Sequence, residues 1–154
     1  MKIDLIAVNR LGRTSENAMT RDFCERASVQ GRSLALGPVD LTEVEPRKSG
    51  KDAEGEVILA AAEGAYLIVC DERGKQYASR AFAERLGKLR DQGERRIAFV
   101  IGGADGTSDA VKAAARESLA FGPQTWPHAL ARVMLAEQVY RAVSILAGSP
   151  YHRD

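Results

Sequence analysis

Two kinds of segment alternate along the chain. Short runs rich in Ile, Val, Leu and Phe are typical of buried strands. Longer segments repeat apolar residues every three or four positions, as amphipathic helices do. The predicted strands cover residues 2–8, 39–45, 65–71 and 95–101, and the predicted helices cover residues 15–31, 52–63, 79–93, 107–120 and 129–148. Repeated strand–helix units predict an α/β fold with a mostly parallel sheet, in a single domain over residues 1–154.

Local signals mark where two of these helices begin. Ser15 is a suitable N-cap for the first helix, and Gly31 is a suitable stop signal. Thr107 or Ser108 would cap the fourth helix.

The last predicted helix is apolar on most of its circumference. A terminal helix of this kind needs a second covering surface. Another copy of the chain is the simplest supplier, which predicts a homodimer; packing into the helix's own sheet is the alternative. The apolar positions are Leu130, Val133, Met134, Leu135, Val139, Tyr140, Val143, Ile145 and Leu146.

Composition narrows the class of protein. With 45% hydrophobic and 28% charged residues, the chain is typical of a soluble globular protein. No apolar run approaches a membrane span and the first residues turn polar too soon for a signal peptide, so we expect a cytoplasmic protein and no membrane partner. Cys24 and Cys70 lie far apart and outside any CxxC pattern. This argues against disulfides and structural zinc, and we expect no metal.

The net charge of +1 is low for a nucleic-acid-binding protein, but it hides local bias. The stretch "PRKSGK" carries Arg47, Lys48 and Lys51 without an acid, and residues 71–96 hold eight Lys or Arg against five Asp or Glu. Either segment could contact phosphates. The alternative is a solvated surface.

A glycine-rich loop, "FVIGGADG", follows one buried strand and precedes a helix. Ligands of open α/β sheets bind at the carboxyl ends of strands, and glycines there allow close backbone approach. The spacing of Gly102, Gly103 and Gly106 matches neither GxGxxG nor a P-loop. It favours a nucleoside-like ligand without a phosphate chain, or a simple tight turn.

Two other segments could join this loop. Cys70 and Asp71 end a central strand, and residues 121–127, "FGPQTWP", form an irregular segment that can present backbone groups to a ligand. His128 and Arg132 follow at the start of the last helix, where a histidine is often structural.

The rest of that helix and the chain end carry further charged and aromatic groups. Glu137 and Arg141 have the i, i+4 spacing of an ion pair. The terminus "PYHRD" carries Tyr151, His152 and Arg153. A histidine and an arginine on so short a tail raise the question of their function.

Five stretches together resemble one family: "DERGK", "FAERL", "FVIGGADG", "WPHALARVMLAEQVYRA" and "PYHRD". In this order and over this length, the chain is similar to the RlmH family of SPOUT-class methyltransferases. The resemblance covers essentially the whole chain. It implies an α/β fold with helices on both faces of a mostly parallel sheet and a C-terminal trefoil knot, acting as a homodimer.

The resemblance also implies an activity. The family transfers a methyl group from S-adenosylmethionine to the N3 position of a pseudouridine in 23S rRNA, preferring the assembled ribosome. Alternatives are a SPOUT methyltransferase acting on another RNA and a non-catalytic RNA- or ribosome-binding protein of this fold. The donor-binding residues carried over are Cys70, Gly102, Gly103, Phe121, Gly122, Pro123, Gln124, Thr125 and Trp126, with Cys70 expected to pack rather than react.

Methyl transfer requires in-line placement and loss of the N3 proton. His152 is the first candidate for the base, and an orienting hydrogen bond to the base or a phosphate is its alternative role. Arg153 suits a phosphate or base carbonyl, and Tyr151 can stack on RNA. Further catalytic candidates are His128, Asp71 and Arg132, and the expected phosphate contacts are Arg47, Lys48 and Lys51.

Overall fold

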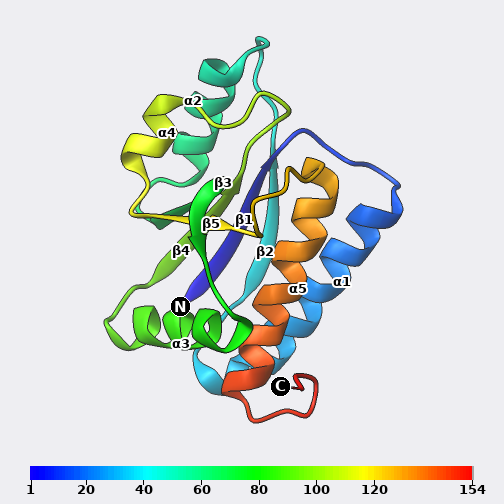
Figure 1. Cartoon of the computed structure of the whole chain (residues 1–154), viewed down its shortest axis with the longest axis vertical. Coiled ribbons are helices and arrows are strands. Elements are labelled where there is room, and N and C mark those ends of the chain that lie inside the picture. The colour runs from blue at the N-terminus through cyan, green and yellow to red at the C-terminus, as the bar shows by residue number, and fades with distance from the viewer. Residues whose placement is uncertain (154) are drawn as a thin grey trace.

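A five-stranded, all-parallel sheet of order β2-β1-β4-β3-β5 organises the computed structural model, which describes residues 1–153 (Figure 1). The strands are β1 (Lys2–Val8), β2 (Val39–Val44), β3 (Tyr66–Gln76), β4 (Arg96–Ile101) and β5 (Glu117–Ala120). The helices are α1 (Ser15–Gly31), α2 (Lys51–Ala61), α3 (Ser79–Asp91), α4 (Asp109–Ala114) and α5 (His128–Leu146), with a short 3-10 turn, η1 (Arg32–Leu34). The predicted α/β class is confirmed; the trefoil knot stays a prediction.

Helices cover both faces of this sheet, because successive side chains of each strand point to opposite sides. On β1, Ile3 and Leu5 pack with α1, α3 and α5, whereas Ile6 and Val8 pack with α2 and α4. Figure 1 shows α2 and α4 on one side of the strands and α1 and α5 on the other. The continuous apolar runs of the sequence therefore mark strands that are buried on both faces.

The last helix, α5, divides its apolar circumference between the core and the surface. Leu135, Val139 and Val143 are fully buried against α1, α3 and the sheet. Val133 and Met134 are half-buried and Leu130 is exposed. The alternative of packing within the same domain thus accounts for one side of α5, and the other side stays open.

The predicted helix over residues 107–120 is wrong in its second half. Ser108 caps α4 as predicted, its hydroxyl accepting a hydrogen bond from the Val111 amide, but α4 ends at Ala114. The Arg116 amide then donates to the Leu67 carbonyl at 2.9 Å, which aligns the next residues as β5 beside β3. A ladder partner available only in the folded sheet decides this boundary. At α1 the N-cap is Thr14 rather than Ser15.

Strand β3 continues five residues beyond the predicted end and carries an irregularity. Cys70 and Lys75 both pair with Leu119 of β5, so residues 71–74 loop out between them. A side chain on Gly74 would come within 2.7 Å of the Leu119 backbone, so only glycine allows the chain to return to the strand. The irregularity leaves Asp71 at the carboxyl edge of the sheet.

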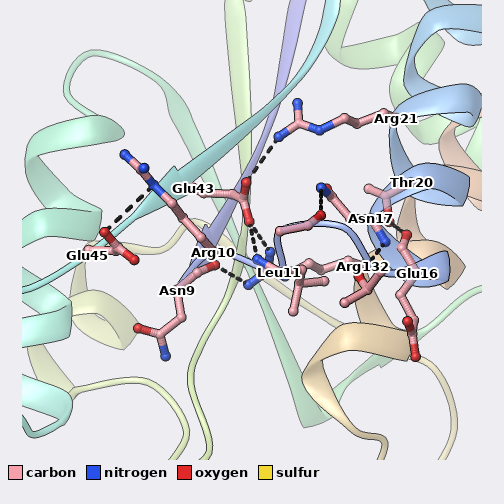
Figure 2. A network of polar contacts seen from close by, with 12 residues as sticks. Asn9, Arg10, Leu11, Glu16, Asn17, Thr20, Arg21, Glu43, Glu45 and Arg132 are labelled. Carbon is pink, nitrogen blue, oxygen red and sulfur yellow. Dashed lines mark hydrogen bonds and ion pairs between the residues drawn. The ribbon is translucent and has the colours of Figure 1, made fainter.

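A buried guanidinium joins the ends of the first two strands to α5 (Figure 2). Arg132 is fully buried and donates to the Val8 carbonyl at 2.6 Å, the Asn9 carbonyl at 2.7 Å and Glu43 Oε2 at 2.9 Å. Glu43 also accepts from the Leu11 amide at 2.8 Å. The first turn of α5 is therefore tied to the turn after β1 and to β2.

The partners of Glu43 keep its carboxylate ionised. Burial alone raises the pKa of Glu43, but the hydrogen bonds from the Leu11 amide and Arg132, with the charges of Arg132 and Arg21, outweigh burial and lower that pKa. Because the folded pKa lies below the ordinary value, the resulting stability is present above pH of about 4.3 and is lost as the pH falls through the folded pKa.

We expect Glu43→Gln to lower the free energy of unfolding by about 3 kcal/mol at pH 7, because it leaves the buried Arg132 without a counter-charge. The deficit relative to the unsubstituted protein should shrink as the pH falls through the lowered pKa of Glu43, because Glu43 itself then becomes protonated. Urea denaturation at pH 7 and at a series of acidic pH values measures this. Glu45→Gln, which removes an exposed ion pair with Arg10, is the control, with a change below about 0.5 kcal/mol. Equal effects of the two substitutions would contradict the assignment.

Candidate active site

A pocket of about 740 Å³ opens at the carboxyl edge of the sheet, where the ends of β3, β4 and β5 meet the start of α5. Its walls are the loop after Cys70, the glycine loop after Ile101 and the segment after Ala120. These are the three strand ends that the sequence singled out. The volume lies within the range of small-molecule sites.

The glycine loop is shaped by contacts that leave no room for a side chain at Gly102. A Cβ there would lie 2.9 Å from the backbone carbonyl of Gly106 and 2.9 Å from the Thr107 methyl group. The Gly106 amide donates to the Gly103 carbonyl at 3.0 Å, which closes the turn. At Gly103 the nearest atoms are the carboxylate oxygens of Glu54, 2.8 Å away, at the end of a flexible side chain. The pocket therefore meets backbone along this wall.

The irregularity within β3 contributes a neutral thiol and an ionised carboxylate. Burial raises the pKa of Cys70 to about 12, so this side chain packs as a thiol. The pKa of Asp71 is lowered, first by the hydrogen bond from the Arg73 amide and then, against the effect of burial, by Lys112, whose Nζ lies 3.3 Å away. A carboxylate with a lowered pKa is a weak base.

The segment before α5 forms the third wall. The Trp126 indole donates to the Phe121 carbonyl at 3.2 Å, and the Thr125 hydroxyl donates to Glu72 Oε2 at 3.1 Å. Gly122 has a φ of 97°, a conformation that favours glycine. Of the predicted donor-binding residues, only Pro123 does not line the pocket; those that do are Cys70, Gly102, Gly103, Phe121, Gly122, Gln124, Thr125 and Trp126.

His128 and Arg132 are one helical turn apart but have different surroundings. His128, the first residue of α5, lines the pocket. Arg132 does not line it, because its guanidinium faces the end of β1 and Glu43. The prediction of Arg132 as a catalytic residue is therefore corrected: its role in this chain is structural. Sequence reasoning missed Thr107 and Lys112 as lining residues, and only the position of α4 beside β3 reveals them.

The chain end folds back along α5 and does not fray. The Tyr151 ring lies 4.6 Å from that of Tyr140, and its hydroxyl donates to Glu137 Oε1 at 3.0 Å. The predicted Glu137–Arg141 pair is confirmed, with Arg141 Nε 3.0 Å from Glu137 Oε1. Neither Tyr151, His152 nor Arg153 lines the pocket of its own chain.

Arg141 also fixes the chemistry of the His152 ring. Arg141 Nη1 lies 3.2 Å from His152 Nδ1. A guanidinium can only donate, so Nδ1 accepts, and the neutral ring carries its proton on Nε2. In this arrangement Nε2 is a hydrogen-bond donor and not a base.

The basic stretch of the β2–α2 connection lies apart from the pocket. Arg47, Lys48 and Lys51 are exposed, and Lys51 is the first residue of α2. None of the three lines the pocket. Within residues 1–153, no group of three or more His, Cys, Asp or Glu side chains could hold a metal ion. No helix in this part of the chain is long and apolar enough to span a membrane.

The fold and its pocket define a class: an open, parallel α/β domain that binds a small ligand at the carboxyl ends of its strands. Solved structures share this fold. A probable methylase family protein from Haemophilus influenzae Rd KW20 superposes with a TM-score of 0.58 and 13% identity, over 99% of this chain and 70% of that one. A probable methyltransferase from Bordetella pertussis Tohama I gives a TM-score of 0.52 at 13% identity, over 92% and 96% of the two chains.

Sequence comparison then gives the family. A family model described as "Predicted SPOUT methyltransferase" matches residues 1–152. The ribosomal RNA large subunit methyltransferase H of Caulobacter sp. (strain K31) is 62% identical over the full length of both chains, and that of Phenylobacterium zucineum is 61% identical over the same extent. The chain belongs to the SPOUT methyltransferases and, within them, to the ribosomal RNA large subunit methyltransferase H family. The resemblance drawn from the five sequence stretches is confirmed.

The two glycines of the loop should differ in their tolerance of a side chain. We expect Gly102→Ala to weaken binding of S-adenosylmethionine, the donor implied by the resemblance, at least tenfold, because the new methyl group meets backbone. Gly103→Ala is the matched control, expected to stay within about threefold because the Glu54 side chain can move. Isothermal titration calorimetry measures both, with melting temperatures to confirm folding. Equal affinities in the two variants would contradict this account of the loop.

Proposed function

We propose that the protein transfers a methyl group from S-adenosylmethionine to a nucleotide of large-subunit ribosomal RNA. The observation that carries the proposal is the 61–62% sequence identity to ribosomal RNA large subunit methyltransferase H proteins over the full length of the chain. The pocket at the carboxyl edge of the sheet supports it. The particular target, N3 of a pseudouridine in the assembled ribosome, follows from the family resemblance and is part of the proposal. Acting on ribosomes places the protein in the cytoplasm.

The pocket suits this methyl donor as substrate. Gly102 lets the loop close tightly against Gly106 and Thr107 at the pocket wall, and the Cys70 thiol stays neutral, so it does not compete as a nucleophile for the methyl group. The carboxylates of Asp71 and Glu72 offset the cations of Arg73 and Lys112, which also line the pocket, so the lining does not repel a cationic sulfonium. Positioning of the two reactants in line can contribute roughly 7–11 kcal/mol of the barrier.

Transfer forms the bond from N3 to the methyl carbon as the sulfur–carbon bond breaks, and the N3 proton goes to a base. We assign that base to His128, which lines the pocket and whose side chain forms no hydrogen bond within residues 1–153. Asp71 is a poorer candidate because its pKa is lowered. His152, with its proton on Nε2, would instead donate to a base carbonyl or phosphate, the alternative that the sequence left open.

A second copy of the chain would complete the site. The tail contacts Glu137 and Arg141, and Glu137 lies nine residues after His128, a rise of about 14 Å along the helix. The tail therefore lies well away from the pocket of its own chain, and the pocket that it can reach is a partner's.

The surface beside the tail supports such a partner. An apolar groove of about 480 Å³ runs between α1, α5 and the end of β5 and includes Met19, Phe23, Val133 and Met134. Met19, which lines this groove, is 51% exposed, and a groove of contiguous apolar side chains favours contact with another chain. Glu137, the partner of Tyr151, also lines this groove. Docking of a second chain here would bring it next to the tail.

Methyl transfer is tested directly with labelled S-adenosylmethionine and ribosomes from a strain that lacks the modification. We expect label on N3 of one pseudouridine, located by mass spectrometry, with assembled ribosomes labelled better than free large subunits or naked rRNA. The donor-binding variant Gly102→Ala is the control for dependence on the pocket. Label at a different nucleotide would replace the target, and absence of label from every rRNA substrate would refute the proposed activity.

A mixed-dimer experiment tests the shared site. Deletion of residues 151–154 should abolish methylation and leave donor binding within about twofold; Asp154 itself lies outside the described residues. A chain with this deletion, mixed with Gly102→Ala chains, should regain activity, because one pocket of the mixed dimer receives an intact tail. Each parent alone is the control, assayed at a donor concentration too low to fill the weakened pocket of Gly102→Ala, so that neither parent is active. If the mixture is as inactive as its parents, the tail serves the pocket of its own chain.

A further inference from the structure

The exposed edge of the sheet carries two hollows that continue from the donor pocket along β5. The first, of about 410 Å³, shares Asp71, Arg73 and Lys112 with the donor pocket. The second, of about 700 Å³, shares Arg116, Glu117 and Ser118 with the first. We call the two hollows together the edge trough. It leads from the mouth of the donor pocket to α3.

A half-buried hydrogen-bond network fixes the floor of the edge trough. Glu117 accepts hydrogen bonds from the hydroxyl of Tyr66 at 2.7 Å and that of Tyr77 at 3.4 Å, and from Arg85 Nε at 2.9 Å. Burial raises the pKa of Glu117, but Arg85 and Tyr66 outweigh it, so the pKa is lowered and the carboxylate stays ionised. The two tyrosine rings are thereby held in place.

Two cationic side chains lie over the faces of these rings and have no carboxylate partner within residues 1–153. The Arg116 guanidinium lies 5.3 Å from the centre of the Tyr66 ring, and Lys75 Nζ lies 4.6 Å from that of Tyr77. Lys88 of α3 lines the same hollow. All three side chains are exposed, and none forms an ion pair within residues 1–153.

The acids of the trough are largely neutralised. Asp71 pairs with Lys112, and Glu117 pairs with Arg85, so Glu84 is the acid left to oppose the cations. The charged lining residues of the two hollows are Arg73, Lys75, Arg85, Lys88, Lys112 and Arg116 against Asp71, Glu84 and Glu117, a net charge of +3. The whole chain has a net charge of only +1, so positive charge is concentrated at this edge.

We propose that the edge trough binds the phosphate backbone of the substrate RNA on its way to the donor pocket. This inference rests on the proposed function and adds the surface along which the RNA lies. Cations held over aromatic rings keep their position and their charge, which suits phosphate contacts. Protection of an edge strand from pairing with other strands also calls for charges. Such protection alone would not require the trough to continue into the donor pocket, whereas in this protein the trough and the pocket share Asp71, Arg73 and Lys112.

The test compares two double variants that remove the same charge. Lys88→Gln/Arg116→Gln alters the edge trough, and Arg32→Gln/Arg95→Gln alters exposed arginines that line neither hollow. For the trough variant we expect KM for ribosomes to rise roughly tenfold and the slope of log K against log salt to fall by about 1.4, or 0.7 for each lost contact to a single strand. Donor affinity, measured by calorimetry, should not change. The control variant should match the unsubstituted protein.

Two further measurements separate the possible failures. Lys88→Arg keeps the charge and should keep the salt slope of the unsubstituted protein. A lower melting temperature of the trough variant would indicate general damage to the fold. Binding of a fluorescent single-stranded RNA oligonucleotide tests the trough independently of catalysis. If the unsubstituted protein binds the oligonucleotide and the trough variant does not, the inference stands even when no methyl transfer is found. Unchanged KM, oligonucleotide affinity and salt slope in the trough variant would overturn it.

Discussion

The position of the whole site depends on one buried guanidinium. Arg132 spans from the first turn of α5 to the turn after β1 and to Glu43 on β2. The carbonyls of Val8 and Asn9 have no further strand to pair with at this point, and a buried carbonyl without a donor is costly. Satisfying them fixes where α5 begins. The segment before α5 and His128 at its start then face the glycine loop across the pocket.

Most of the fold could be predicted because each long element has one dominant period. Strands β1 and β4 are covered on both faces and therefore read as continuous apolar runs. Strand β5 could not be predicted in this way: it has four residues, follows an alanine-rich helix directly and gains its identity from hydrogen bonds to β3. The same strand carries the edge trough, so a local ambiguity in the sequence concealed a surface feature.

The candidate site was predictable only as far as topology dictates it. Residues at the ends of parallel strands must meet at one edge, so Gly102, Asp71 and the segment 121–127 could be grouped without a structure. The sequence does not tell a buried arginine from an exposed one: Arg132 and Arg141 stand on the same helix, and only the structure assigns one to the core and the other to the tail. The distance between tail and pocket is likewise a property of the folded helix.

Nearly neutral charge and RNA recognition are compatible when charges are distributed unevenly. Much of the acidic content is committed to internal partners, as Glu43 is to Arg132 and Glu117 to Arg85. The cations on tyrosine rings at the β5 edge have no such partner, so local potential exceeds what the net charge suggests. The donor pocket combines backbone, the neutral Cys70 thiol and charged side chains that balance one another. At the donor pocket the carboxylates of Asp71 and Glu72 offset the cations of Arg73 and Lys112, so the positive charge that holds the RNA increases along the edge, away from a cationic methyl donor that it would repel.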